Sequence, residues 1–182
     1  MEKTRLPEIA MEKMVVHIKG ITPIMPSAMH EFTEKTEDED KLYEACFYYD
    51  ENGNYAMPGT GAKKMLVNAG QRFTKFAGTT LKGALFVMAK WNTILDLEGK
   101  PHKKPIPSTD WITVGGRMRR QKTRPTFPNW TMDIPVTYLK SVLNSTQILH
   151  IFQIAGLAIG YSTWRPEKGG TYGQFEVTGA TK

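Results

Sequence analysis

Residues 160–175 read GYSTWRPEKGGTYGQF, a glycine-rich stretch between an apolar helical pattern and a final alternating segment. Its glycines permit backbone conformations that other residues avoid, and they let main-chain N–H groups approach an anion closely. Arg165 and Lys168 add positive charge, while Trp164 and Tyr172 offer flat rings on which bases can stack. The stretch therefore indicates a nucleic-acid-binding loop. The alternative is a tight connection shaped by glycines, in which Trp164 fills the core.

The segments on either side of this loop predict a helix and a strand. Residues 144–159 begin with a polar cap and continue as an apolar helical stretch, which Gly160 is placed to end. After the loop, residues 174–178 alternate as a final strand. Residues 130–138 alternate in the same way, but Pro135 cannot donate a hydrogen bond within a sheet. Pairing is therefore expected to end before Pro135, or a bulge to occur there.

The rest of the chain supplies a first strand, a long loop, an acidic hairpin with strands at 42–49 and 55–57, a first helix and a second strand. They are predicted, in that order, over residues 14–20, 22–40, 42–57, 61–73 and 85–95. For the last of these, a helix is the alternative, because Leu81, Leu85 and Met88 also have helical spacing. The order strand, helix, strand, basic excursion, strand, helix, strand predicts an α+β fold of the ferredoxin-like (RRM-like) split βαβ type. We expect one domain over residues 1–182, with an acidic insertion at about 21–57 and a basic one at about 96–124.

Charge is distributed unevenly along the chain, whose formal net charge is +6. Residues 100–125 contain eight basic residues and one acid, whereas residues 31–51 contain nine acids and two lysines. Basic residues interleaved with aromatic ones suit a single-stranded polyanion, although a solvated charged loop is the alternative. Gly115 and Gly116 predict an exposed, flexible tip for the basic segment. The two segments of opposite charge also suggest a head-to-tail contact between copies.

Several other kinds of site are excluded or disfavoured. A lone Cys46 rules out an intramolecular disulfide, and the four histidines lack metal-ligand spacing, so we expect neither metal nor cofactor. Without a hydrophobic signal region or a bilayer-spanning stretch, we expect a cytoplasmic protein of a bacterial or phage-infected cell and no membrane partner. Residues 58–64 (PGTGAKK) lack the spacing of a phosphate loop, although Lys63 and Lys64 are placed to touch a phosphate.

Three stretches together resemble the RAMP superfamily, the ferredoxin-like RNA-binding proteins of CRISPR effector complexes. They are the glycine-rich residues 160–175, the first strand running into residues 20–24 (GITPI), and residues 57–59 (MPG) at the start of the first helix. The chain is most similar to the backbone subunit that coats the guide RNA. Residues 124–130 and 164–170 are also similar to small stand-alone members from phage and prophage genomes. The resemblance implies a basic thumb at about residues 96–124 and other CRISPR effector subunits as partners.

We therefore expect a non-enzymatic protein that binds single-stranded nucleic acid, favouring RNA over DNA, and forms homo-oligomers along the strand. An alternative is a metal-independent RNA endonuclease of the same superfamily with His17 or His30 as general base. A second alternative is a phage anti-defence module that binds another protein. The predicted nucleic-acid-binding residues are His17, Lys19, Lys63, Lys64, Arg117, Arg119, Arg120, Lys122, Arg124, Trp164, Arg165, Lys168, Gly169, Gly170 and Tyr172.

Overall fold

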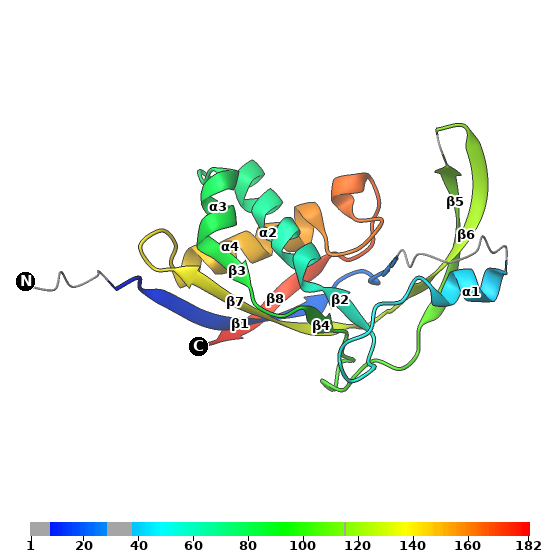
Figure 1. Cartoon of the computed structure of the whole chain (residues 1–182), viewed down its shortest axis with the longest axis horizontal. Helices are drawn as coiled ribbons and strands as arrows, with labels where there is room; N and C mark the ends of the chain where they lie inside the picture. The colour runs from blue at the N-terminus through cyan, green and yellow to red at the C-terminus, as the bar shows by residue number, and fades with distance from the viewer. Residues whose placement is uncertain (1–7, 29–37, 115) are drawn as a thin grey trace, which may run out of the picture.

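A four-stranded antiparallel sheet lies at the centre of the chain (Figure 1). The computed structural model describes residues 8–28, 38–114 and 116–182, so His30 and most of the predicted loop before residue 38 lie outside the described residues. The sheet has the order β3-β7-β1-β8. Its strands are β3 (Leu85–Val87), β7 (Thr131–Leu139), β1 (Met11–Gly20) and β8 (Phe175–Thr181). The α+β class and the strands predicted at 14–20, 130–138 and 174–178 are confirmed, with their ends shifted by up to three residues.

Alternation along the strands gives the sheet two different faces. In β1, Val16 and Ile18 are buried, whereas His17 and Lys19 point to the opposite face. The helices α2 (Gly59–Phe73), α3 (Gly78–Ala84) and α4 (Ser145–Ile154) gather over the buried face, as Figure 1 shows. The core therefore lies between this helical layer and the sheet, while the other sheet face carries polar side chains together with Val15 and Pro135.

Local sequence signals set the start of α4 and the end of the helical turn that continues it. The side chain of Asn144 accepts a hydrogen bond from the N–H of Gln147, and the side chain of Gln147 accepts one from the N–H of Asn144. This capping box satisfies two amides that a helix start otherwise leaves unpaired. The helix continues as a π-helical turn, η1 (Ala155–Ile159), and ends at Gly160, whose φ is 78°. The predicted helix over 144–159 and its glycine stop are thus confirmed.

Pro135 lies inside β7 without disturbing the register between β7 and β1, where it stands opposite Val15. Its carbonyl accepts a 3.2 Å hydrogen bond from the N–H of Met88, so its backbone faces the β3 side. The ladder between β3 and β7 ends one residue away, at Val136. Both outcomes expected from the sequence are therefore wrong, because the β1 ladder continues through Pro135 without a bulge. The proline, which cannot donate a hydrogen bond, is tolerated because it lies just beyond the end of the β3 ladder.

The strand predicted over residues 85–95 is wrong in extent. It is divided into β3 and β4 (Trp91–Thr93), and β4 pairs with β2 (Ala56–Pro58) in a separate two-stranded sheet. The chain leaves the first sheet because residues 88–90 turn onto the start of α2, where the N–H of Gly59 donates to the carbonyl of Lys90. The alternative helix through Leu81, Leu85 and Met88 is correct only in its first part, because α3 ends at Ala84.

The strand predicted over residues 42–49 is wrong, because Glu39–Glu44 form the short helix α1. The carboxylate of Asp38 accepts hydrogen bonds from the N–H groups of Asp40 and Lys41 and caps this helix. Acidic residues in the first turn also interact favourably with the helix dipole. The hairpin turn that follows is present: Tyr49 pairs with Tyr55, the N–H of Ala56 donates to the carbonyl of Tyr48, and Gly53 adopts a φ of 76°.

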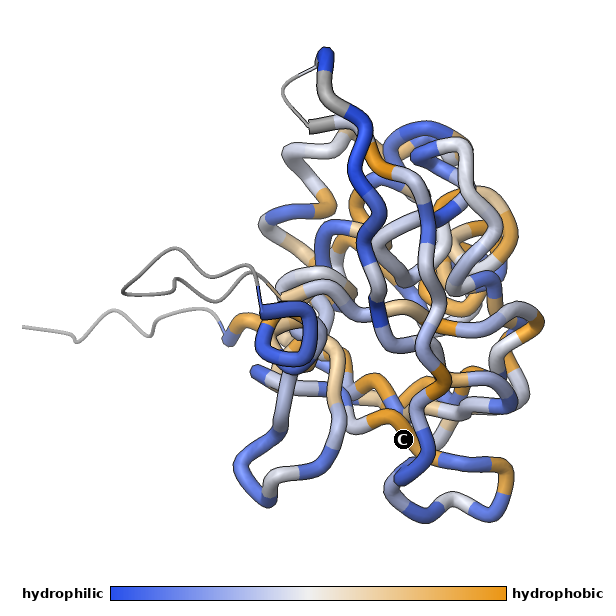
Figure 2. The backbone as a smooth tube through the Cα atoms, turned by 90° about the vertical axis from the view of Figure 1, so that its right-hand side faces the viewer, coloured by the Kyte–Doolittle hydropathy of each residue, from blue (hydrophilic) through white to orange (hydrophobic). Residues whose placement is uncertain are grey.

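The basic excursion folds into a projecting β-hairpin of β5 (Ile106–Val114) and β6 (Met118–Thr126). Figure 1 shows it rising beyond the central sheet, and Figure 2 shows the hydrophilic colour along much of it. Near its tip, Gly116 adopts a φ of 75°, a conformation that favours glycine. The excursion is thus a regular paired ribbon along most of its length, which the sequence pattern did not predict.

The hairpin is fastened to the core where it joins β7. Phe127 is buried and exchanges two backbone hydrogen bonds with Ile24, so the start of the loop predicted over residues 22–40 is packed against the core. Trp130 is fully buried, and its indole N–H donates to the carbonyl of Thr22 at 2.8 Å. Gly20 lies so close to this ring that a Cβ at residue 20 would stand 2.2 Å from the indole nitrogen. The absence of a side chain at Gly20 therefore lets Trp130 hold the hairpin to the sheet.

We expect Gly20→Ala to displace Trp130 and to lower the free energy of unfolding by about 1–3 kcal/mol through overpacking. Gly83→Ala is the matched control, because nothing lies within 4 Å of a Cβ placed there in α3. At that helical position alanine is expected to stabilise by about 0.5–1 kcal/mol. Urea unfolding measures both changes, and a Gly20→Ala variant as stable as the wild type would contradict this account of the hairpin base.

Candidate nucleic-acid interface

Strand β6 places three basic residues on one face of the hairpin. Arg120, Lys122 and Arg124 occupy alternate positions, and the β5–β6 register sets Asp110 opposite Lys122 and Ser108 opposite Arg124. Alternate residues of a strand lie roughly 6.6 Å apart. This basic face therefore presents a row of cations at regular intervals along the hairpin.

Arg124, at the base of this row, is a buried anchor. Its side chain is only 5% exposed, and its Nη2 lies 3.7 Å from Oδ2 of Asp110. Its Cζ stands over the ring of Trp164, 5.5 Å from the centroid. Within the described part of the chain, its Nε and Nη2 atoms have no hydrogen-bond partner. Arg124 thus connects β6 to the glycine-rich loop, a role that differs from the solvent-facing one expected from the sequence.

The glycine-rich loop (residues 160–174) touches the hairpin at a second point. The hydroxyl of Tyr172 lies 3.4 Å from the hydroxyl of Ser108 in β5. Trp164 is 37% exposed, so the alternative in which it fills the core is wrong. Gly170 is required by a close approach, because a Cβ there would lie 2.0 Å from the carbonyl oxygen of Trp164. The structure therefore brings together the glycine-rich loop and the basic segment, although the two are far apart in the sequence.

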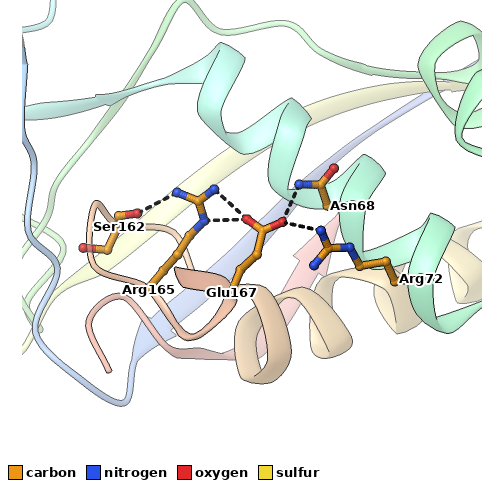
Figure 3. Close-up of polar contacts among 5 residues, drawn as sticks. All are labelled: Asn68, Arg72, Ser162, Arg165 and Glu167. Carbon is orange, nitrogen blue, oxygen red and sulfur yellow. Dashed lines mark hydrogen bonds and ion pairs between the residues drawn. The ribbon is translucent and has the colours of Figure 1, made fainter. Parts of the chain in front are cut away.

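A buried carboxylate fixes the loop to α2, as Figure 3 shows. Glu167 lies in the 3₁₀ turn η2 (Pro166–Lys168), and its side chain is 7% exposed. It accepts hydrogen bonds from Nε and Nη2 of Arg165 at 2.9 and 2.6 Å and from Asn68 of α2 at 2.8 Å. Arg72 of α2 lies 3.3 Å away, and Nη1 of Arg165 also donates to the carbonyl of Ser162. Arg165 is therefore held in one orientation.

These contacts also set the ionisation of Glu167. Burial alone would raise the pKa of this carboxyl, but hydrogen bonds and the positive charge of Arg165, with Arg72 and Asn68, hold it below its usual value. The carboxylate is therefore charged at neutral pH. Its charge helps to hold the loop against α2.

Glu167→Gln preserves the side-chain shape and leaves two arginines facing a neutral amide. We expect the free energy of unfolding at neutral pH to fall by about 1–3 kcal/mol. Because folding lowers this pKa, the stabilisation is present above the unfolded value of roughly 4.3 and is lost as the pH falls through the folded value. In urea unfolding, the difference between wild type and variant should shrink in acid.

The exposed Glu98 supplies the control, since it pairs only with the exposed Lys100 within the described residues. Glu98→Gln should change the free energy of unfolding by less than about 0.5 kcal/mol. A Glu167→Gln effect that is equally small, or that does not vary between neutral and acidic pH, would contradict the role given to this carboxylate.

Four cations of the hairpin have no partner within the described residues. No ion pair or hydrogen bond of their side chains occurs there. Lys168 of the loop is likewise exposed. These groups are placed to meet an external anion, and the four on the hairpin are Arg117, Arg119, Arg120 and Lys122.

The acidic helix α1 packs beside β6 of the same chain (Figure 1). The residue Cys46, which follows α1, is close enough to the hairpin that Lys122 and Arg124 affect its thiol. Burial raises the pKa of Cys46, and these two cations oppose the rise. The segments of opposite charge thus meet within one chain. A contact between two copies is therefore not needed to bring the opposite charges together. The head-to-tail multimer stays a prediction.

Two predicted residues lie on the open face of the sheet, away from the helices. Nδ1 of His17 is 2.6 Å from Oδ1 of Asp133 in β7, and its Nε2 is 3.4 Å from the hydroxyl of Thr181. Lys19 is exposed on the same face. No contact joins either residue to the hairpin or to the glycine-rich loop within the described residues. They form a separate surface.

Lys63 and Lys64 have different environments although they are adjacent in α2. The ammonium of Lys63 donates to the carbonyls of Lys82 and Leu85 and lies 4.6 Å from the centroid of the Phe86 ring. Burial lowers its pKa. Lys64 instead is exposed and lines a cavity together with Arg165. Only Lys64 therefore joins the interface.

Trp111 is a candidate that the sequence prediction omitted. It is 58% exposed in β5 and lies opposite Gln121, on the hairpin face that also carries Arg119. Trp111 lies on the same strand face as Thr109 and Thr113, two residues to either side. Polar residues at these alternate positions indicate an exposed face, but the signal is recognisable only once the hairpin is known. Each face of the hairpin thus carries at least one cation. The face with Arg119 also carries the exposed ring of Trp111.

Other kinds of site find no support in the part of the chain that the structure describes. No group of three or more His, Cys, Asp or Glu side chains there is arranged to hold a metal ion. The described helices are also too short or too polar to cross a membrane.

Comparisons with known proteins identify structural relatives. No protein-family model and no curated protein matches the sequence. The fold is similar to a chain in the cryo-EM structure of the type III-B Cmr-β complex bound to cognate target RNA, with a TM-score of 0.59 and 12% identity. That match covers 94% of this chain and 60% of the other, so this chain spans about three fifths of the length of the chain it matches. Cmr6 from Pyrococcus furiosus also matches, with a TM-score of 0.48, 9% identity and coverage of 93% and 100%.

Proposed function

We propose that this protein binds single-stranded nucleic acid on the surface formed by the basic face of the β5–β6 hairpin and the glycine-rich loop. The observation that carries the proposal is the junction of the two elements, through Arg124 over Trp164 and Tyr172 beside Ser108. It places the ring of Trp164, 37% exposed, at the base of a row of cations that continues through the half-buried Lys122 to the exposed Arg120. No catalytic step is part of the proposal.

The chemistry of this surface suits a flexible strand better than a duplex. Regularly spaced cations neutralise successive phosphates without reading sequence, and exposed rings stack on unpaired bases. Arg120 and Lys122 supply the charge, and Trp164 supplies the ring. Arg124 covers part of the indole of Trp164, and the part that stays exposed is available to stack on a base.

We infer that RNA is the preferred strand. The structural relative in the Cmr-β complex is part of an assembly described as bound to target RNA, which supports this choice. The sheet order β3-β7-β1-β8, with α2 after β1 and α4 after β7, further supports a ferredoxin-like core of the RAMP type carrying the hairpin as an inserted thumb. In this proposal the chain acts within, or in a manner similar to, a CRISPR ribonucleoprotein.

The double variant Arg120→Gln, Lys122→Gln tests the proposal, because both side chains project from the hairpin without partners in the described chain. We expect weaker binding of a fluorescent 20-nucleotide RNA. The slope of log K against log salt concentration should become shallower by about 1.4, since each contact with a single strand contributes roughly 0.7. Fluorescence anisotropy at several salt concentrations measures both quantities. The RNA should be recovered intact.

The matched control is Lys75→Gln, Lys82→Gln, which removes the same charge from exposed positions in and beside α3. Its salt slope should stay close to that of the wild type. Equal slopes for the hairpin and control variants would contradict the proposed surface. Equal affinity for double-stranded and single-stranded RNA would contradict the proposed role of stacking.

A further inference from the structure

A cavity of about 290 Å³ lies between the first turns of α2 and the glycine-rich loop. This volume is near the lower end of the roughly 300–1,000 Å³ typical of ligand sites. Tyr48, Met57 and Met65 form an apolar part of its lining. Lys64 and Arg165 also line it and bring two cations from distant parts of the sequence. A flat apolar ring attached to an anion matches these two kinds of lining.

The two cations are arranged differently. Arg165 is fixed, because Glu167 holds its Nε and Nη2 and the carbonyl of Ser162 accepts from its Nη1. Lys64 has no ion pair or hydrogen bond within the described residues. The first turn of α2 contains no acidic residue that would repel an anion. Lys64 is thus an available partner for a phosphate. Beside it, the side of the cavity formed by Arg165 is already held in place.

The position of the cavity relates it to the strand. Thr163 and Arg165 line it, and Trp164 lies between them in the chain. A strand that stacks one base on Trp164 therefore passes next to the cavity. A neighbouring nucleotide is within reach if its base leaves the stack, which costs little in a single strand.

We propose that the cavity receives one nucleotide of the bound strand, with its base against Met57, Met65 and Tyr48 and its phosphate at Lys64. This inference rests on the proposed function and adds a defined subsite to it. Contacts with phosphates alone do not distinguish one base from another. A base held in the cavity can be distinguished by its size and by the hydrogen-bonding groups on its edge. The site takes a nucleotide unit, and the strand is its source.

Photo-cross-linking of the full chain tests the subsite. The probe is a 12-nucleotide oligouridylate that contains 4-thiouridine, and the cross-linked peptides are identified by mass spectrometry. We expect cross-links in the peptides that contain Tyr48 and residues 57–65. Thr163→Trp fills the cavity from its rim and should reduce these cross-links by about tenfold or more, while the affinity for the oligonucleotide changes by less than about threefold because the hairpin contacts remain.

Thr171→Trp is the matched control, since Thr171 is exposed on the same loop and does not line the cavity. Its cross-linking pattern should equal that of the wild type. Both tryptophan variants are first checked for wild-type thermal unfolding. If Thr163→Trp unfolds, Lys64→Gln replaces it and should weaken cross-linking to residues 57–65, whereas Lys75→Gln should not.

The outcomes separate this inference from the proposed function. Cross-links confined to the hairpin, Trp164 and Tyr172 would overturn the subsite while leaving strand binding intact. A wild-type protein that binds no oligonucleotide would overturn both. Free uridine 5′-monophosphate is the last arm: if it displaces the strand's cross-link at concentrations near those of the oligonucleotide itself, the site serves a free nucleotide and the assignment to the strand is wrong.

Discussion

The contact between Arg124 and Trp164 joins the two halves of the proposed binding surface. An isolated two-stranded hairpin is marginally stable in water, so a projecting ribbon needs attachments at its base. Phe127 and Trp130 attach the hairpin to the core, and Arg124 attaches it to the glycine-rich loop. A cation over an aromatic ring contributes about 0.5–2 kcal/mol, more as the pair is removed from water. The buried position of Arg124 thus favours one arrangement of hairpin and loop.

Electrostatics explains why this surface is available to a ligand. Arg165 and Arg72 share the single carboxylate of Glu167, and Arg124 lies near Asp110. The cations further along the hairpin lack such partners within the described residues. Like charges along one ribbon repel each other, and the nearby acidic helix α1 offsets part of this repulsion. A polyanion that binds the hairpin offsets it more completely, which makes binding strongly dependent on salt.

The sequence was informative wherever a short local pattern determines the structure. Asn144 and Gly160 set the ends of the helix made by α4 and η1, and alternation located the strands of the main sheet. The assignment of residues 42–49 to a strand failed because aromatic residues are common in strands and this segment is rich in them. The helix that occupies residues 39–44 is instead set by its cap at Asp38, upstream of the segment. Local signals were therefore sufficient for most of the core and misleading in the acidic insertion.

The candidate site was predictable in its composition and not in its geometry. Tryptophan, arginine and glycine in one loop indicated binding, but no local signal shows that Arg124 is buried, because its environment depends on how the hairpin docks against the loop. The role of Glu167 was hidden for the same reason, since Arg72 and Asn68 reach it only through the packing of α2. Residues that act through tertiary contacts require the fold before they can be assigned.

In the proposed arrangement, the hairpin and the glycine-rich loop form one binding surface. Hydrogen–deuterium exchange with and without a saturating single-stranded RNA tests this most directly. We predict that amides of residues 106–126 and 160–174 become protected together, while the open sheet face around His17 and Lys19 does not change. Protection of the hairpin alone, or of the open sheet face instead, would contradict the claim.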